Sequence, residues 1–211
     1  MAAASFFDER ADEYDRWYDE HEALYRAELQ AVRAELPPSG PGLEIGVGTG
    51  RFAAPLGAGF GIDLSLPMLG LADRRRVRVC NAEGERLPFR DGAFRFVLLV
   101  TVIAFLEDPT PVFREAHRVI GEDGRIVVAF IDGASSLGRH YSRREAKGAF
   151  RSARFCTPPE VAAWAKGAGF IGPVFRQTLI GTPPDYPEPQ SVHDGFGEGG
   201  FVVLSAERAR R

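Results

Sequence analysis

The stretch from Leu43 to Gly50, Leu-Glu-Ile-Gly-Val-Gly-Thr-Gly, constrains this chain more than any other. An apolar run that enters a glycine-rich turn predicts a short buried strand and a loop whose backbone a ligand can approach closely. A second apolar run ends at Asp63, where a carboxylate is expected to accept ribose hydroxyls in nucleoside-binding α/β folds. The alternative for Asp63 is to cap the helix that follows it.

The spacing of the glycines separates two classes of cofactor. A dinucleotide-binding turn reads G-x-G-x-x-G, but Arg51 occupies the position of its third glycine. The observed pattern is E-x-G-x-G-x-G, beginning at Glu44. This pattern resembles motif I of the class I S-adenosylmethionine (SAM) dependent methyltransferases. The resemblance implies that SAM is the cofactor and that S-adenosylhomocysteine is the product.

Three later stretches extend the resemblance over roughly residues 42–131. The stretch Asn81–Phe89 is similar to G-D-A-E-x-L-P-F of the same enzymes, with an amide in place of the usual acid. Phe94-Arg95 stands where the family has Phe-Asp, so a second motif acid is replaced. Gly121–Arg125 is similar to the glycine turn that precedes the fifth strand in the family.

The resemblance implies which residues of these motifs contact the cofactor. The side chain at Asn81 would meet the adenine amino group, and backbone near Thr101 would meet the methionine part. Leu64 and Met68 would supply apolar surface against the adenine or, alternatively, pack in the core. The expected cofactor residues are Glu44, Gly46, Gly48, Gly50, Asp63, Leu64, Met68, Asn81, Ala82, Glu83 and Thr101.

Short apolar runs alternate with helical segments along most of the chain. We expect strands at about residues 42–47, 60–63, 77–80, 94–102, 125–131, 174–180 and 200–205. Parallel strands that are covered on both faces have this composition. The prediction is an α/β fold with a doubly wound, mostly parallel, seven-stranded sheet, the Rossmann-like methyltransferase fold. It would occupy residues 37–211, with a helical insertion at about 135–150 and a helix capped by Thr157.

The first 36 residues predict helices rather than strands. Ser5–Asp8 has the form of a capping box, and aromatic residues then recur at helical spacing. The aromatic face of Tyr14, Trp17 and Tyr18 resembles the family's lid segment, so residues 1–36 form either a lid or a helix packed permanently on the sheet. Phe105 is a candidate substrate contact or a core residue. His140 is a candidate substrate contact or a surface histidine.

Composition narrows the functional classes. The net charge of -3 gives no general case for nucleic acid, and no apolar run approaches the ~18 residues of a membrane span. Two cysteines and four scattered histidines predict neither a disulfide framework nor a metal site. The acidic N-terminus is unlike a secretory signal, so we expect a cytoplasmic protein, either monomer or homodimer.

Methyl transfer from a sulfonium is an in-line displacement in which the enzyme mainly positions the reactants and excludes water. A dedicated base is optional, and no catalytic residue is assigned. The leading hypothesis is therefore transfer to a small-molecule acceptor. RNA or protein methylation is an alternative, supported by the basic stretch at residues 139–154. A non-catalytic SAM- or nucleoside-binding module is another, suggested by Asn81 and Arg95.

Overall fold

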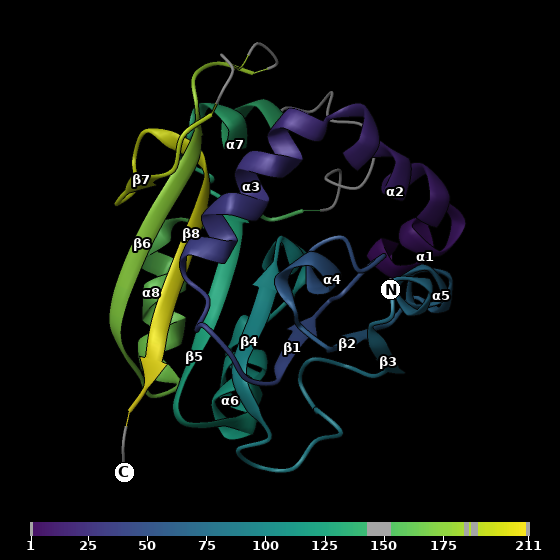
Figure 1. The fold of residues 1–211 in the computed structure, drawn as a ribbon. Helices are drawn as coiled ribbons and strands as arrows, with labels where there is room; N and C mark the ends of the chain where they lie inside the picture. The colour runs from purple at the N-terminus through teal and green to yellow at the C-terminus, as the bar shows by residue number, and fades with distance from the viewer. Residues whose placement is uncertain (1, 143–152, 184–185, 187–189, 210–211) are drawn as a thin grey trace.

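The computed structural model describes residues 2–142, 153–183, 186 and 190–209. In this part of the chain, eight strands form one sheet in the order β3-β2-β1-β4-β5-β8-β6-β7 (Figure 1). Neighbours from β3 to β5 pair in parallel, whereas β8 runs antiparallel to both β5 and β6. The strands are β1 (Gly42–Ile45), β2 (Phe60–Asp63), β3 (Arg78–Asn81), β4 (Phe94–Val100), β5 (Ile120–Ile131), β6 (Phe170–Ile180), β7 (His193–Asp194) and β8 (Gly199–Arg208).

This architecture confirms the doubly wound, mostly parallel sheet. Each of the seven expected strands is present, and the two-residue β7 adds a short eighth strand at the edge beside β6. The expected turn at Gly121–Arg125 lies within β5 instead of before it. There the register against β4 shifts between Phe94 and Phe96, and Asp123 adopts a left-handed φ of 59°. A local irregularity in a continuous strand therefore takes the place of the turn.

Helices cover both faces of the sheet, because successive strand side chains point to opposite sides. In β4, Val97 and Leu99 belong to the core cluster under α6 and α8, whereas Leu98 belongs to the cluster under α3 and α4. The helices are α1 (Ala2–Glu9), α2 (Ala11–Glu20), α3 (Glu22–Ala34), α4 (Ala53–Leu56), α5 (Leu66–Arg74), α6 (Pro109–Val119), α7 (Ser136–Tyr141) and α8 (Pro158–Gly167), with a 3-10 helix at Val102–Phe105.

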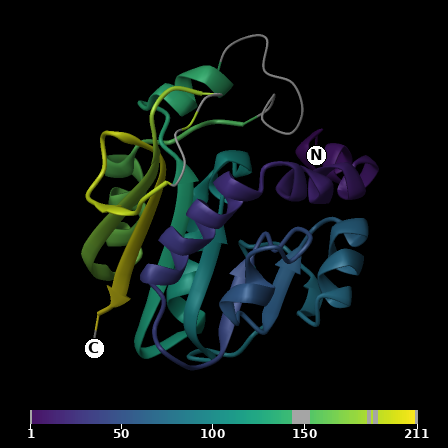
Figure 2. The same ribbon diagram turned by 45° about the horizontal axis from the view of Figure 1, so that its top comes forward.

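The N-terminal segment contains three helices with different surroundings. The capping box expected at Ser5–Asp8 is wrong, because α1 runs through Ser5 without a break. Ala31 and Val32 of α3 are fully buried against the sheet, so α3 is part of the core. Helices α1 and α2 lie near the carboxyl edge of the parallel strands (Figure 2). Only α1 and α2 therefore remain as candidates for a lid.

The other two helix predictions have different outcomes. Helix α8 begins directly after Thr157, as expected, and the Glu160 carboxylate accepts hydrogen bonds from both the backbone N–H and the hydroxyl of Thr157, each at 2.8 Å. Of the insertion expected at about 135–150, α7 accounts for Ser136–Tyr141, and residues 143–150 lie outside the described residues. No helix in the described ranges is both long and apolar enough to cross a membrane.

Candidate functional site

A cavity of about 320 Å³ opens where β1, β2 and β4 end. We call it the strand-end cavity. Loops after the carboxyl ends of parallel strands are the usual place for ligands in open α/β sheets. Seven of the eleven predicted cofactor residues line it: Gly46, Gly48, Asp63, Leu64, Met68, Ala82 and Thr101. Glu44, Gly50, Asn81 and Glu83 lie outside its lining.

Asp63 is held in the strand-end cavity by backbone hydrogen bonds. Its Oδ2 accepts from the N–H of Gly48 at 2.8 Å, and its Oδ1 accepts from the N–H of Ser65 at 2.9 Å. Ser65, whose hydroxyl accepts from the N–H of Met68 at 3.4 Å, is the cap of α5, so the alternative of Asp63 as the helix cap is wrong. Burial raises the pKa of Asp63. A carboxylate has more lone pairs than these backbone bonds use, so Asp63 could still accept a ligand hydroxyl.

The three glycines of the turn have different reasons to be glycine. All three have left-handed φ angles, of 71°, 50° and 80° in chain order. A Cβ on Gly46 would lie 2.4 Å from Cγ2 of Val102, and one on Gly50 would lie 3.1 Å from Cα of Ala72. A Cβ on Gly48 would meet only Tyr14, at 3.9 Å. Gly46 and Gly50 therefore serve packing within the protein, whereas Gly48 leaves room at the cavity.

Glu44 lies buried beneath the glycine turn, with 2% of its surface exposed. The backbone of Ala53 donates a hydrogen bond to the carboxylate, but Oε2 has no partner among the residues that the structure describes. Burial, and more weakly the charge of Asp63, raise the pKa of Glu44 well above its usual range. Glu44 lines a pocket of about 20 Å³ together with Gly48 and Thr101. Its free oxygen could therefore hold a cationic group that reaches down from the strand-end cavity.

Asn81 braces a turn beside the strand-end cavity. Its side-chain amide donates to the carbonyl oxygens of Asp63 at 3.0 Å and Leu64 at 2.9 Å. The Glu83 carbonyl accepts a hydrogen bond from the backbone of Arg86 at 3.2 Å. Between them, Ala82 contributes to the cavity wall. The amide of Asn81 thus holds the β2–α5 turn in place, and Ala82, Gly84 and Glu85 are the members of this motif that line the cavity.

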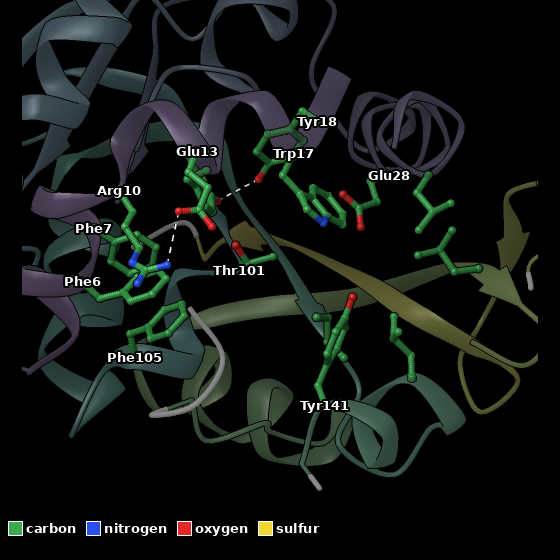
Figure 3. Close-up of a pocket in the computed structure, with 15 residues that line it drawn as sticks. Phe6, Phe7, Arg10, Glu13, Trp17, Tyr18, Glu28, Thr101, Phe105 and Tyr141 are labelled. Carbon is green, nitrogen blue, oxygen red and sulfur yellow. Dashed lines mark hydrogen bonds and ion pairs between the residues drawn. The ribbon is translucent and has the colours of Figure 1, made fainter. Parts of the chain in front are cut away.

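A second cavity, of about 220 Å³, also has Thr101 in its lining (Figure 3). We call it the aromatic cavity, because seven of the residues that line it are aromatic. It contains four of the five predicted substrate residues: Tyr14, Trp17, Tyr18 and Phe105. His140 is not among them, since it lines a separate open pocket with Arg139 and Thr182. The neighbouring Tyr141 of α7 reaches the aromatic cavity instead.

The two cavities share a wall formed by Phe7, Tyr14, Thr101 and Phe105. The ring of Phe7 makes edge contacts with Tyr14 and with Phe105, at centroid distances of 5.6 and 5.3 Å. Thr101 adopts a left-handed φ of 56°, and its N–H donates to the carbonyl of Ala129 at 2.8 Å. A non-glycine residue in this conformation is strained, and such strain gathers at functional sites. Thr101 turns the chain away from β4 at the junction of the cavities.

Two charged residues stand out among those that sequence reasoning missed at this site. Arg51, which the sequence analysis used only to exclude a dinucleotide-binding turn, forms ion pairs with Asp15 and Asp19 of α2. Glu28, which has 8% of its surface exposed, lines the aromatic cavity. Its position, four residues after Leu24 and four before Val32, places it on the apolar face of α3. A charged residue on such a face is a signal that could have identified it.

No group of three or more His, Cys, Asp or Glu side chains in the described ranges has the arrangement of a metal site.

Residues 43–128 match the model of the methyltransferase domain family. An uncharacterised protein of Methanocaldococcus jannaschii is 42% identical over 203 residues, which cover 96% of this chain and 98% of that protein. The malonyl-[acyl-carrier protein] O-methyltransferase of Geobacter sulfurreducens is 30% identical, over 81% of this chain and 72% of that enzyme.

A solved structure has nearly the same architecture. It is a SAM-dependent methyltransferase from Thermotoga maritima, described as a possible histamine N-methyltransferase. The TM-score is 0.93 at 39% sequence identity, with 98% of this chain and 100% of that chain covered. Agreement over whole chains at this identity extends beyond the sheet to the N-terminal helices. The chain belongs to the class I SAM-dependent methyltransferases.

Proposed function

We propose that the strand-end cavity binds SAM and that the aromatic cavity binds a small-molecule methyl acceptor. The observation that carries this proposal is the wall that the two cavities share at Tyr14 and Thr101. A donor in one cavity and an acceptor in the other would meet at this wall. When bound, SAM supplies an electrophilic methyl group on a sulfonium.

The residues of the strand-end cavity fit such a cofactor. Asp63 offers lone pairs for the ribose hydroxyls, and Met68 and Leu64 offer apolar surface for the adenine. The free oxygen of Glu44 would accept a hydrogen bond from the ammonium of the methionine part. Burial raises the pKa of both carboxyl groups, so a cationic ligand would stabilise their ionised forms.

The aromatic cavity suits the second requirement of methyl transfer, which is exclusion of water. Phe6 and Phe7 of α1 and Trp17 of α2 cover it from one side, and Leu137 and Tyr141 of α7 line it as well. Covers on both sides favour a small acceptor over a folded macromolecule. The Thermotoga maritima relative, described as a possible histamine N-methyltransferase, also supports a small-molecule acceptor. We propose α1 and α2 as the lid, with α3 as its fixed support.

A labelled-methyl assay tests this proposal against RNA or protein methylation. Calorimetry with S-adenosylhomocysteine first establishes whether the cofactor binds. Protein with methyl-labelled SAM is then given a metabolite extract below 1 kDa, total RNA or a folded protein mixture, in separate reactions. We expect label to enter only the metabolite fraction. Label in RNA or protein would overturn the small-molecule acceptor, and absence of cofactor binding would overturn the assignment of the strand-end cavity.

A further inference from the structure

Glu28 places a carboxyl group at the wall of the aromatic cavity. Glu28 is on α3, 8% exposed, and lines the cavity with its side chain directed inward (Figure 3). Among the described residues, no hydrogen bond or ion pair reaches it. Buried carboxylates are normally paired, because an isolated charge is costly to remove from water. An unpaired carboxyl at the wall of a cavity therefore indicates a missing cation.

Among the described residues, the groups whose pKa the charge of Glu28 affects are tyrosine hydroxyls. Tyr14 and Tyr18 face it from α2, and Tyr141 faces it from α7, in each case close enough for Glu28 to raise the pKa of the tyrosine. Tyr186, whose buried hydroxyl has no partner in the described part of the chain, is affected in the same way.

Two further charged groups line the cavity, Arg10 and Glu13. They form an exposed ion pair with each other at 3.2 Å. Burial is the cause of the raised pKa of Glu28, and no cation among the described residues lowers it. A cationic ligand could therefore balance the ionised form of Glu28.

We propose that the methyl acceptor carries an ammonium group and that Glu28 binds this group inside the aromatic cavity. The inference rests on the proposed function, since it names the class of acceptor for the same site. The rings of Trp17, Tyr18 and Tyr141 line the same cavity, and aromatic faces attract cations when water is excluded. An acidic acceptor would disfavour the ionised carboxylate, and a neutral one could pair with Glu28 by a hydrogen bond but not as an ion pair.

The position of Glu28 makes it an anchor for the acceptor. It lines the aromatic cavity only, whereas Thr101 and Phe105 belong to the wall shared with the strand-end cavity. In Figure 3, Glu28 projects from α3 on the side of the cavity away from Phe105. An acceptor whose ammonium lies at Glu28 therefore extends its apolar body, and its reacting atom, toward Thr101.

This arrangement links binding to proton release. Burial raises the pKa of Glu28 to about 8, so the carboxyl of the empty cavity is mostly protonated at pH 7. An ammonium ligand favours the carboxylate, so binding at pH 7 should release close to one proton, and binding at pH 9.5 should release almost none. A neutral ligand should release none at either pH.

The test is calorimetry on the full chain saturated with S-adenosylhomocysteine. The probes are 2-phenylethylamine and hexylamine, each compared with the alcohol and the carboxylate of matching length. We expect each amine to bind at least tenfold more tightly than its partners and to release a proton at pH 7, as measured in buffers of different ionisation enthalpy. Glu28→Gln should abolish both the preference and the proton release, and Glu28→Asp should retain part of the preference. Glu20→Gln, an exposed change on α2, should alter neither.

Equal responses to amine, alcohol and acid, including no response to any of them, would overturn the inference. An amine preference that survives Glu28→Gln would also overturn it. Binding of S-adenosylhomocysteine, measured first in wild type and variants, separates these outcomes from failure of the proposed function. Normal cofactor binding without amine preference rejects only the acceptor class, whereas loss of cofactor binding in the wild type rejects the underlying assignment.

Discussion

Arg51 forms a two-pronged ion pair with Asp15. Its Nε donates to Oδ1 and a terminal nitrogen donates to Oδ2, both at 2.9 Å. Arg75 donates to the same Oδ2 at 2.9 Å. The pair fastens α2, which covers the aromatic cavity, to the residue directly after the glycine turn. Burial would raise the pKa of Asp15, but hydrogen bonds from Arg51 and Arg75 outweigh it and lower the pKa to about 2.

We expect Arg51→Met to lower the free energy of unfolding by about 1.5–3 kcal/mol, the range for hydrogen bonds to charged groups. It should also speed release of S-adenosylhomocysteine, because α2 loses its attachment to the turn. Urea denaturation and stopped-flow release measure the two effects. Arg26→Met, which removes an exposed pair with Glu22, should cost no more than about 0.5 kcal/mol and leave release unchanged. Equal effects of the two changes would show that the Asp15 pair does not hold the cover.

Asp63→Asn should weaken SAM binding by about 1.5–3 kcal/mol, roughly ten- to a hundredfold. The amide keeps one acceptor oxygen but lacks the charge that strengthens bonds to the ribose hydroxyls. Asparagine keeps an acceptor oxygen for one of the two backbone N–H groups that bond to Asp63, those of Gly48 and Ser65, whereas alanine would leave both without it. Calorimetry measures the loss, with Asp91→Asn as a control in an exposed ion pair with Arg118. Tighter binding of NAD than of SAM by the wild type would contradict the assignment of the cavity.

Gly48→Val and Gly46→Ala should fail in different ways. Gly48 has open space around its Cβ position, so its valine variant should fold, with a cost of about 1–2 kcal/mol for the left-handed backbone, and should lose SAM binding. Even the single methyl of Gly46→Ala would meet Val102 at 2.4 Å, so that variant should lose stability first. Circular dichroism and calorimetry on both variants separate these results. A valine variant that binds SAM normally would show that Gly48 does not face the cofactor.

Glu28 should make the empty protein less stable as pH rises. Its pKa is about 8 in the folded chain against 4.5 as the ordinary value, so the folded state holds an extra proton between these limits. The free energy of unfolding should therefore fall by about 1.4 kcal/mol per pH unit in that window. Glu28→Gln removes this dependence. The free energy of unfolding of the variant minus that of the wild type should therefore be roughly 4 kcal/mol larger at pH 8 than at pH 5. Urea denaturation at both pH values checks this, and parallel pH profiles would refute it.

Deletion of residues 1–20 should leave the sheet folded, because α3 begins at Glu22 and carries the buried contacts of Ala31 and Val32. The deletion removes the cover of the aromatic cavity, so most transfer activity and some cofactor retention should be lost. Tyr18 is 6% exposed, so some loss of stability is expected as well. Loss of the fold by circular dichroism would make α2 part of the core. Full activity after the deletion would favour a large acceptor that seals the site itself.

The local sequence was sufficient for the sheet and for much of the strand-end cavity. Apolar runs of four to nine residues predict the buried strands, and their alternation with helical segments along the chain predicts a parallel sheet. Asp63 ends β2 because the apolar run ends there, and the carboxyl ends of parallel strands meet at one edge. Gly46, Gly48 and Asp63 could therefore be placed together from the sequence alone.

Only the tertiary structure decided which side chains face that space. The amide of Asn81 turns to the carbonyls of Asp63 and Leu64, and Tyr141 rather than His140 reaches the aromatic cavity. Glu28 and Tyr141 line the same cavity although more than a hundred residues separate them, because α3 and α7 pack over the same end of the sheet. Periodicity reports on neighbours within one helix or strand. The partners of a side chain across elements depend on how those elements pack, which no local pattern contains.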